Sequence, residues 1–388
     1  MIYNFDALMN RRGTSSEKWD IKYPGWPDAL PMWVADMDFA APPEVTAAIA
    51  ERVAHGVYGY THPEGPDYDA PVRWRQARCG HAIKPEWVLF SSGVVCSLKA
   101  VVNALTSPGD AVVVQPPVYP PFMAIVEQAG CEVVANPLLQ DNAGRWGMDL
   151  DHLESCFKQG ARLMFLCSSH NPVGRVWTPQ ELSDLASLCV RYDVVVASDE
   201  IHCDILRPGY CHTAIASLPD MEERVITLFS TTKTFNLAGM QNSVTTIAHK
   251  SLRRKVADEL YRCNHDTPNL FGMIAQRAAW THGGQWLDQM NAYVAQNCDR
   301  ALKMLAGQQV ILPTMPEGTY LLWLDCRAVS ADERDLVDFF ANTCRVWPTM
   351  GKAYGAEGFA RLNLATSRTV VEEGIGRILE GLRIIGKL

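Results

Sequence analysis

The sequence predicts an α/β fold, with a large domain built on a mostly parallel, doubly wound sheet and a smaller α+β domain after it. Short runs of β-branched residues alternate with helical patterns through the middle of the chain, which is typical of parallel strands joined by helical crossovers. Several of these runs are apolar at successive positions, as strands covered on both faces should be. The alternation ends in the last part of the chain, which favours a separate second domain.

The elements of the large domain follow from this alternation. Strands are expected at residues 87–91, 110–115, 131–137, 161–167, 194–199, 225–229 and 243–248. Helices are expected between them at residues 94–106, 119–128, 150–158 and 179–192. The last helix has the clearest start, because Thr178 can act as N-cap and Glu181 can complete a capping box. In a doubly wound sheet, a ligand binds beyond the carboxyl ends of the strands.

The smaller domain has its own set of elements. Strands are expected at residues 320–326 and 359–365, and helices at residues 332–343 and 369–385, after a long helical stretch at 274–305. We therefore expect the large domain to cover residues 51–285 and the small domain residues 286–388. Residues 1–50, which are rich in Trp and Pro, are expected to pack with the small domain.

Composition excludes several classes of protein. The 388 residues are 48% hydrophobic and 20% charged, which fits a globular protein rather than a disordered one. The net charge of −8 argues against nucleic acid or an anionic membrane as the partner. No signal peptide or membrane-spanning stretch is recognisable, so we expect a cytoplasmic protein. The 12 cysteines lack metal-ligand spacing, so we expect reduced thiols and no bound metal.

Five residues with ligand-binding chemistry follow the ends of predicted strands: Gly93, Tyr119, Asn171, Asp199 and Lys233. Four of them have ordinary alternatives, namely a glycine turn, a surface tyrosine, an Asn–Pro turn and a solvated lysine. Asp199 is harder to explain, because a carboxylate at the end of a buried strand is costly without a partner. Together they supply a phosphate cradle, a plate for a flat ring, an oxygen-binding amide, a carboxylate for a ring nitrogen and an amine for an aldehyde. Those groups meet the requirements of pyridoxal 5′-phosphate (PLP).

The same residues resemble a known family. The order Tyr119, Asn171-Pro172-x-Gly174, Asp199-Glu200-x-His202 and Ser230-x-x-Lys233 is similar to that of the aminotransferase-like, fold-type I PLP-dependent enzymes over nearly the whole chain. More narrowly, the chain resembles the cystathionine β-lyase and cystalysin group, the MalY- and PatB-type C–S lyases. This narrower resemblance is carried by residues 33–39, 58–61, 116–119, 170–177, 198–202, 233–239, 317–320 and 361–363.

The resemblance implies how the cofactor ring would be held. Lys233 would bind the cofactor aldehyde and later act as the general base, and Asp199 would pair with the pyridine nitrogen. Asn171 and His202 would lie at the ring oxygen, and Tyr119 would stack on the ring. Residues implied to bind the phosphate are Gly93, Val94, Val95, Ser230 and Thr232.

Two further residues are assigned by the resemblance. Tyr60 would reach the phosphate from a neighbouring subunit, which implies a homodimer with shared active sites. Arg361 would clamp the α-carboxylate of a small amino-acid substrate through a bidentate ion pair.

The chain departs from the family pattern at two places. Ser168 and Ser169 precede His170 where the family often has Asn-Pro, which puts the shape of this loop in doubt. Gln241 stands where aspartate-type aminotransferases have a phosphate-binding arginine, which favours the lyase branch and leaves the phosphate with less cationic support.

The resemblance implies β-elimination on a cysteine S-conjugate, with a thiol, pyruvate and ammonia as products. An aminotransferase on the same scaffold and a regulatory PLP-binding protein are the alternatives. Sequence leaves open whether Tyr60 or Tyr119 protonates the departing sulfur, and which conjugate is preferred. It also leaves open whether Trp19, Trp26 and Trp33 line the substrate pocket or pack in the core.

Overall fold

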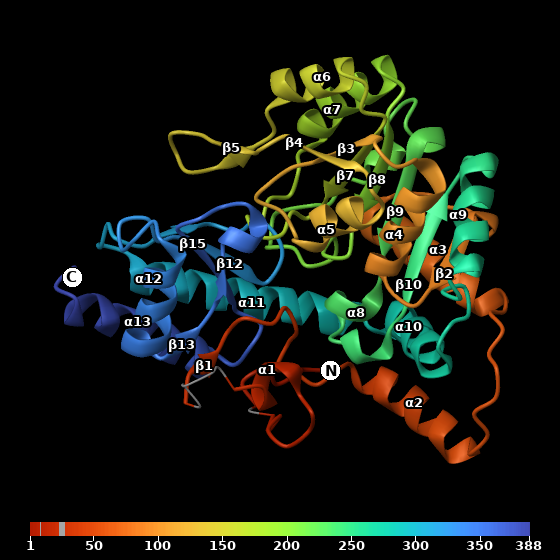
Figure 1. Cartoon of the computed structure of the whole chain (residues 1–388). Coiled ribbons are helices and arrows are strands. Elements are labelled where there is room, and N and C mark those ends of the chain that lie inside the picture. Colours follow the sequence, from red (N-terminus) through yellow and green to blue (C-terminus); the bar gives the residue numbers. More distant parts are fainter. Residues whose placement is uncertain (8, 23–27) are drawn as a thin grey trace.

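The computed structural model describes residues 1–7, 9–22 and 28–388, and its centre is a seven-stranded sheet (Figure 1). The strand order is β2 (Val88–Ser91), β10 (Ser243–Ile247), β9 (Val225–Phe229), β8 (Val195–Asp199), β7 (Leu163–Cys167), β3 (Ala111–Val114) and β4 (Glu132–Ala135). Strand β10 runs antiparallel to both of its neighbours, and all other pairs are parallel. The predicted mostly parallel sheet is therefore confirmed. Strand β10 is reversed because the chain turns back after β9 without a long crossover helix.

Helices cover both faces of this sheet, as the continuous apolar strands predict. In β7, Leu163, Phe165 and Cys167 pack with one core cluster, while Met164 and Leu166 pack with another on the opposite face. The helices of the large domain are α3 (Gly65–Cys79), α4 (Val94–Leu105), α5 (Pro121–Gln128), α6 (Leu150–Lys158), α7 (Pro179–Arg191), α8 (Thr231–Thr234), α9 (Lys250–Arg262) and α10 (Leu270–His282). Strands β7 and β8 end at the same edge of the sheet, where Cys167 lies opposite Asp199.

The small domain holds a four-stranded antiparallel sheet, seen on the left of Figure 1. Its strands are, in spatial order, β11 (Leu312–Thr314), β12 (Leu321–Asp325), β15 (Phe359–Asn363) and β14 (Thr349–Met350). Helix α12 (Glu333–Asp338), a π-helical turn (Phe339–Cys344) and helix α13 (Arg368–Ile384) pack on it. A two-stranded hairpin, β5 (Leu139–Gln140) and β6 (Trp146–Gly147), extends from the large domain.

Two helices replace the single stretch expected at residues 274–305. Helix α10 ends at His282, and α11 (Gly284–Leu305) then runs toward the small domain (Figure 1). Gly283 lies at the break, where an added Cβ would come within 2.4 Å of the Phe235 ring. The expectation of one continuous helix was therefore wrong, because this close approach depends on a residue far away in the sequence.

The N-terminal segment contacts both parts of the molecule. Strand β1 (Leu30–Pro31) pairs with β13 (Val346–Trp347) of the small domain, and Met32 joins the same core. Phe5, Met37 and Phe39 pack instead against the core of the large domain, beside helices α10 and α11. The remaining helices of the segment are α1 (Glu17–Asp20) and α2 (Pro43–His55). The expected domain limits stay a prediction.

No helix in residues 1–7, 9–22 and 28–388 is both long enough and apolar enough to pass through a membrane. All twelve cysteines are free thiols, and most of them are buried.

Candidate active site

A cavity of about 480 Å³ opens at the carboxyl edge of the large sheet, next to the small domain. This volume is in the range of pockets that hold a cofactor or a small ligand. Ten of the residues singled out from the sequence line it: Gly93, Val94, Val95, Tyr119, Asn171, Asp199, His202, Thr232, Lys233 and Arg361. Nine of them come from the ends of five strands of the large sheet, as expected if the carboxyl ends of neighbouring strands share one edge, and Arg361 comes from β15 of the small domain.

Lys233 projects into this cavity from the short helix α8. Ser230 starts this helix directly after β9, and its hydroxyl accepts a hydrogen bond from the backbone N–H of Thr232 (3.1 Å). The Lys233 Nζ donates to the carbonyl oxygen of Ala35 at 2.6 Å. Burial and the nearby Arg361 guanidinium lower the pKa of Lys233 to about 8. About a tenth of this amine is therefore neutral at pH 7, far more than for an ordinary lysine, so it can act as a nucleophile or a base.

Asp199 ends the buried strand β8 and faces the same cavity. Burial raises the pKa of its carboxyl group to about 7, because the backbone N–H of Ile201 (3.0 Å) and the charge of Lys233 compensate only in part. Within the described part of the chain, Asp199 forms no ion pair. A buried carboxylate of this kind is stabilised by a cationic ligand, and a protonated ring nitrogen would provide one.

Arg361 connects the two domains across the cavity. It lies on β15, is 4% exposed, and its Nη1 donates to the Asn171 Oδ1 at 3.1 Å. Its Nη2 donates to the carbonyl oxygen of Trp33 (2.8 Å) and to the Thr349 hydroxyl (3.3 Å). These bonds fix the plane of a buried cation with no carboxylate partner among the described residues, so it is prepared to receive a ligand carboxylate.

His202 is buried beside Lys233 and Arg361. Burial and these two cations lower the pKa of its imidazole to about 3, so it is neutral at physiological pH. Its Nδ1 is buried and has no hydrogen-bond partner among the described residues. An unpaired polar atom on a cavity wall indicates a polar ligand atom nearby. Tyr119 lines the cavity from the loop after β3, and burial raises the pKa of its hydroxyl.

An anion can be bound at the end of the cavity nearest α4. This helix begins at Val94 with Gly93 as N-cap, and no side chain caps its first N–H groups. Free N–H groups at a helix N-terminus bind phosphate well. Gln241 and Asn242 line the cavity as well, and both are uncharged. Among the described residues that line the cavity, the cationic side chains are those of Lys233 and Arg361.

Two of the predicted residues lie elsewhere in this single chain. Ser230 is buried below the cavity, where its hydroxyl donates to the carbonyl oxygen of Asn242 (2.7 Å). Tyr60 is fully exposed on the segment between α2 and α3 and does not line the cavity.

The cavity also contains residues to which the sequence analysis assigned no role in the site, although Val34 and Ala35 lie in the segment 33–39 that carries the family resemblance. Glu17, Val34 and Ala35 belong to the N-terminal segment, and Tyr354 lies under the Arg361 guanidinium, 5.2 Å from the ring centre. No strand-end pattern marks these positions, because they reach the site through packing between domains. Trp33 lines the cavity, while Trp19 packs against the small-domain core. Trp26 lies outside the described residues.

Comparison with known proteins agrees with this geometry. Residues 31–378 match the family model for aminotransferases of class I and II. The cystathionine β-lyase PatB of Bacillus subtilis (strain 168) is 40% identical over 386 residues, which cover 98% of this chain and 100% of that protein. The chain belongs to the class I and II aminotransferase family, in its cystathionine β-lyase group.

Solved structures of this group have the same fold as the chain. The crystal structure of cystalysin from Treponema denticola, which contains PLP, has a TM-score of 0.95 and 30% identity, and the match covers 99% of this chain and 100% of that one. The PLP-bound C–S lyase from Staphylococcus hominis has a TM-score of 0.91 and 32% identity, with 98% of both chains covered. The expected aminotransferase-like fold is therefore confirmed.

Proposed function

We propose that this protein is a PLP-dependent C–S β-lyase that cleaves L-cystathionine or related cysteine S-conjugates. The observation that carries this proposal is the buried Asp199, which forms no ion pair among the described residues and faces the same cavity as the Lys233 amine with its lowered pKa. PLP uses both groups at once, because its ring nitrogen pairs with a carboxylate and its aldehyde reacts with an amine. The PLP found in cystalysin and in the C–S lyase of the same group supports this assignment.

The residues of the cavity fit the cofactor on all sides. Lys233 would bind its aldehyde, Asp199 its ring nitrogen, and Asn171 and His202 its ring oxygen. The N-terminus of α4 with Thr232 would hold its phosphate, and the Tyr119 ring would lie against its face. When bound, PLP supplies the electron sink that makes the substrate Cα–H acidic.

The chain's own residues then handle the substrate. Arg361 holds the α-carboxylate through its guanidinium, whose plane is set by Asn171, Trp33 and Thr349. The Lys233 Nζ lines the same cavity and, as a free amine, would remove the Cα proton of the bound substrate. The Ala35 carbonyl, which also accepts a hydrogen bond from the Tyr320 hydroxyl (2.9 Å), gives this amine a fixed position. Either Tyr119 or Tyr60 supplies a proton to the departing sulfur.

Overall, the substrate loses its Cβ–S bond and takes up one water. The sulfur leaves with a proton as a thiol, and the remaining enamine is hydrolysed to pyruvate and ammonium. No oxidant or second substrate is required, in contrast to transamination.

We also infer that the protein acts in the cytoplasm as a homodimer with shared active sites. Tyr60 has its whole side chain exposed, and Val57 and Tyr58 of the same segment are more than half exposed. A second copy covering this segment would bury the apolar groups and bring Tyr60 to the neighbouring phosphate site.

The decisive test replaces the amine. Lys233→Ala should reduce pyruvate release from cystathionine by about 10⁴-fold, because both the attachment group and the general base are lost. The purified native protein should be yellow, and borohydride should remove its visible absorption band by fixing the cofactor covalently to the chain. In the variant, borohydride should not attach the cofactor to the chain. Lys158→Ala, at an exposed lysine of α6, is the matched control and should leave turnover unchanged.

Two results would count against the proposal. Unchanged turnover in Lys233→Ala would place the amine elsewhere. Formation of a keto acid without thiol or ammonia from native protein would indicate an aminotransferase instead.

A further inference from the structure

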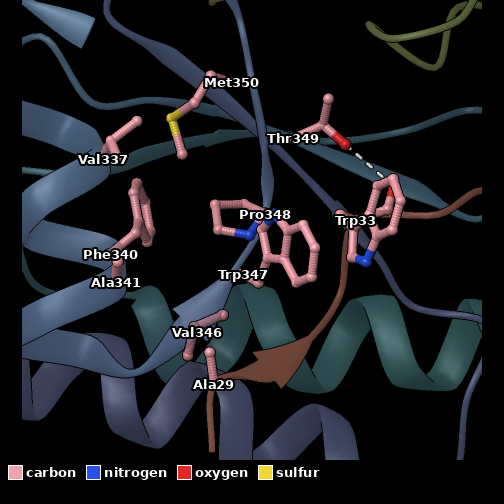
Figure 2. Close-up of a pocket in the computed structure, with 10 residues that line it drawn as sticks. All are labelled: Ala29, Trp33, Val337, Phe340, Ala341, Val346, Trp347, Pro348, Thr349 and Met350. Atoms are coloured by element: carbon pink, nitrogen blue, oxygen red, sulfur yellow. Dashed lines mark hydrogen bonds between the residues drawn. The ribbon is translucent and has the colours of Figure 1, made fainter. Parts of the chain in front are cut away.

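An apolar chamber lies beside the active-site cavity, between the small domain and the N-terminal segment, which contributes Ala29 and Trp33 (Figure 2). Its volume is about 160 Å³, close to that of a protein cavity that accepts benzene. In Figure 2, Trp347 and Pro348 face Val337, Phe340 and Met350 across it. None of its described lining residues is charged, so the chamber is suited to an apolar group and unsuited to an ammonium or a carboxylate.

The chamber and the active-site cavity share two lining residues, Trp33 and Thr349. The Thr349 hydroxyl donates to the carbonyl oxygen of Trp33 at 3.0 Å, and both oxygens accept hydrogen bonds from Arg361. A substrate whose carboxylate is held by Arg361 therefore lies next to the wall that separates the two spaces. Its side chain would reach the chamber along Trp33, which lines both spaces.

Trp33 lies at the junction between the chamber and the active-site cavity. Its indole stacks on that of Trp347, with ring centres 4.6 Å apart and planes 14° from parallel. Its Nε1 is buried and has no hydrogen-bond partner in the described residues. The junction thus offers a flat aromatic surface and one free N–H donor, which suits an aromatic ring attached through a polarisable sulfur.

We propose that this chamber receives the substituent on the sulfur of the substrate, so that the preferred substrates are cysteine conjugates carrying an aryl or branched alkyl group of about benzene size. The inference rests on the proposed C–S lyase activity and narrows its substrate class. The far end of cystathionine carries an ammonium and a carboxylate, which the chamber cannot solvate. We therefore expect the far end of cystathionine to point toward solvent, on the side where the exposed Glu17 lines the cavity.

The test compares S-benzyl-L-cysteine, S-methyl-L-cysteine and L-cystathionine as substrates of the PLP-loaded enzyme, scored by pyruvate release. S-benzyl-L-cysteine should have a kcat/KM at least about tenfold above that of S-methyl-L-cysteine, the effect expected for a filled apolar pocket. Val337→Phe, which fills the chamber from its half-exposed wall, should remove this advantage. It should change kcat/KM for cystathionine and S-methyl-L-cysteine by less than about twofold.

Val329→Phe is the matched control, because Val329 is a half-buried valine of the same domain that does not line the chamber. It should keep the full preference for the benzyl substrate. In every variant, activity on cystathionine shows whether the enzyme is folded and loaded with PLP. Loss of the proposed lyase activity and loss of the benzyl preference alone are therefore distinguishable.

A second measurement tests binding alone and does not depend on catalysis. (Benzylthio)acetate has the carboxylate, sulfur and ring but no amine, and calorimetry should show it binding the native enzyme at least about tenfold more tightly than (methylthio)acetate. Its binding should also have a negative heat-capacity change. Equal affinity for the two acids, or a benzyl preference that survives Val337→Phe, would overturn the proposal.

Discussion

Two neighbouring carboxylates at the end of β8 have opposite environments although both are buried. Asp199 faces the cavity, and burial raises its pKa to about 7. Glu200 points to the other side of the strand, where it meets the Arg75 guanidinium (2.5 Å) and His212 Nε2 (2.9 Å). Burial alone would raise the pKa of Glu200 as well, but Arg75 and His212 hold it below its usual value.

The difference shows that the partner, rather than burial, decides what a buried carboxylate does. Glu200, Cys203 and His212 lie close enough together for a metal site, yet Arg75 already occupies the position of the cation. This side of the strand is a completed network that connects α3 to the sheet. The other side is an incomplete network whose missing member is the ligand, as expected of a binding site.

Glu200→Gln should have the largest effect on stability. It leaves the Arg75 charge buried without a counter-charge, so the free energy of unfolding should fall by about 3–5 kcal/mol. Denaturation by urea measures this loss, and activity of the folded enzyme should remain within about tenfold of the native value. Glu357→Gln, which breaks an exposed pair with Lys352, should change stability by less than about 1 kcal/mol. Equal stability of the two variants would contradict the contrast drawn for β8.

Asp199→Asn should have the reverse effect. Because Asp199 has no ion-pair partner in the part of the chain that the structure describes, the cofactor-free variant should be at least as stable as the native chain. Pyruvate release should fall by about 10²–10³-fold, since a neutral amide cannot hold the ring nitrogen in its charged form. Steady-state kinetics with saturating PLP, beside thermal denaturation of the cofactor-free proteins, checks both parts. A variant that loses stability and keeps activity would reverse the roles of Asp199 and Glu200.

A smaller effect should appear in the pH dependence of the cofactor-free protein. The pKa of Asp199 is about 7 when folded and 3.8 when unfolded, so the folded chain holds the proton more tightly. The resulting stabilisation is complete below pH 4 and is lost as the pH rises through 7. From pH 5 to pH 8 the native protein should therefore lose about 2–3 kcal/mol more than Asp199→Asn, measured by urea denaturation. Bound PLP should remove this difference by supplying a counter-charge; an equal pH response of the two cofactor-free proteins would show that Asp199 is already paired.

Local sequence signals predicted much of the large domain. Strand Val225–Phe229 and helix Leu150–Lys158 have the predicted limits, and Thr178 and Glu181 form the predicted capping box. These features depend on residues a few positions apart. The break at Gly283 and the reversal of β10 were missed, because both are decided by contacts with distant segments.

The candidate site divides in the same way. The sequence by itself determined that the side chains at the ends of β2, β3, β7, β8 and β9 meet, because residues at the carboxyl ends of parallel strands emerge at one edge of the sheet. Tertiary packing decided which of them have partners. Arg75 comes from α3 to neutralise Glu200, whereas no cation among the described residues pairs with Asp199. Packing of the N-terminal segment and the small domain also placed Trp33, Thr349 and the apolar chamber beside Arg361. Such long-range contacts depend on how whole surfaces pack together, which a local sequence pattern does not specify.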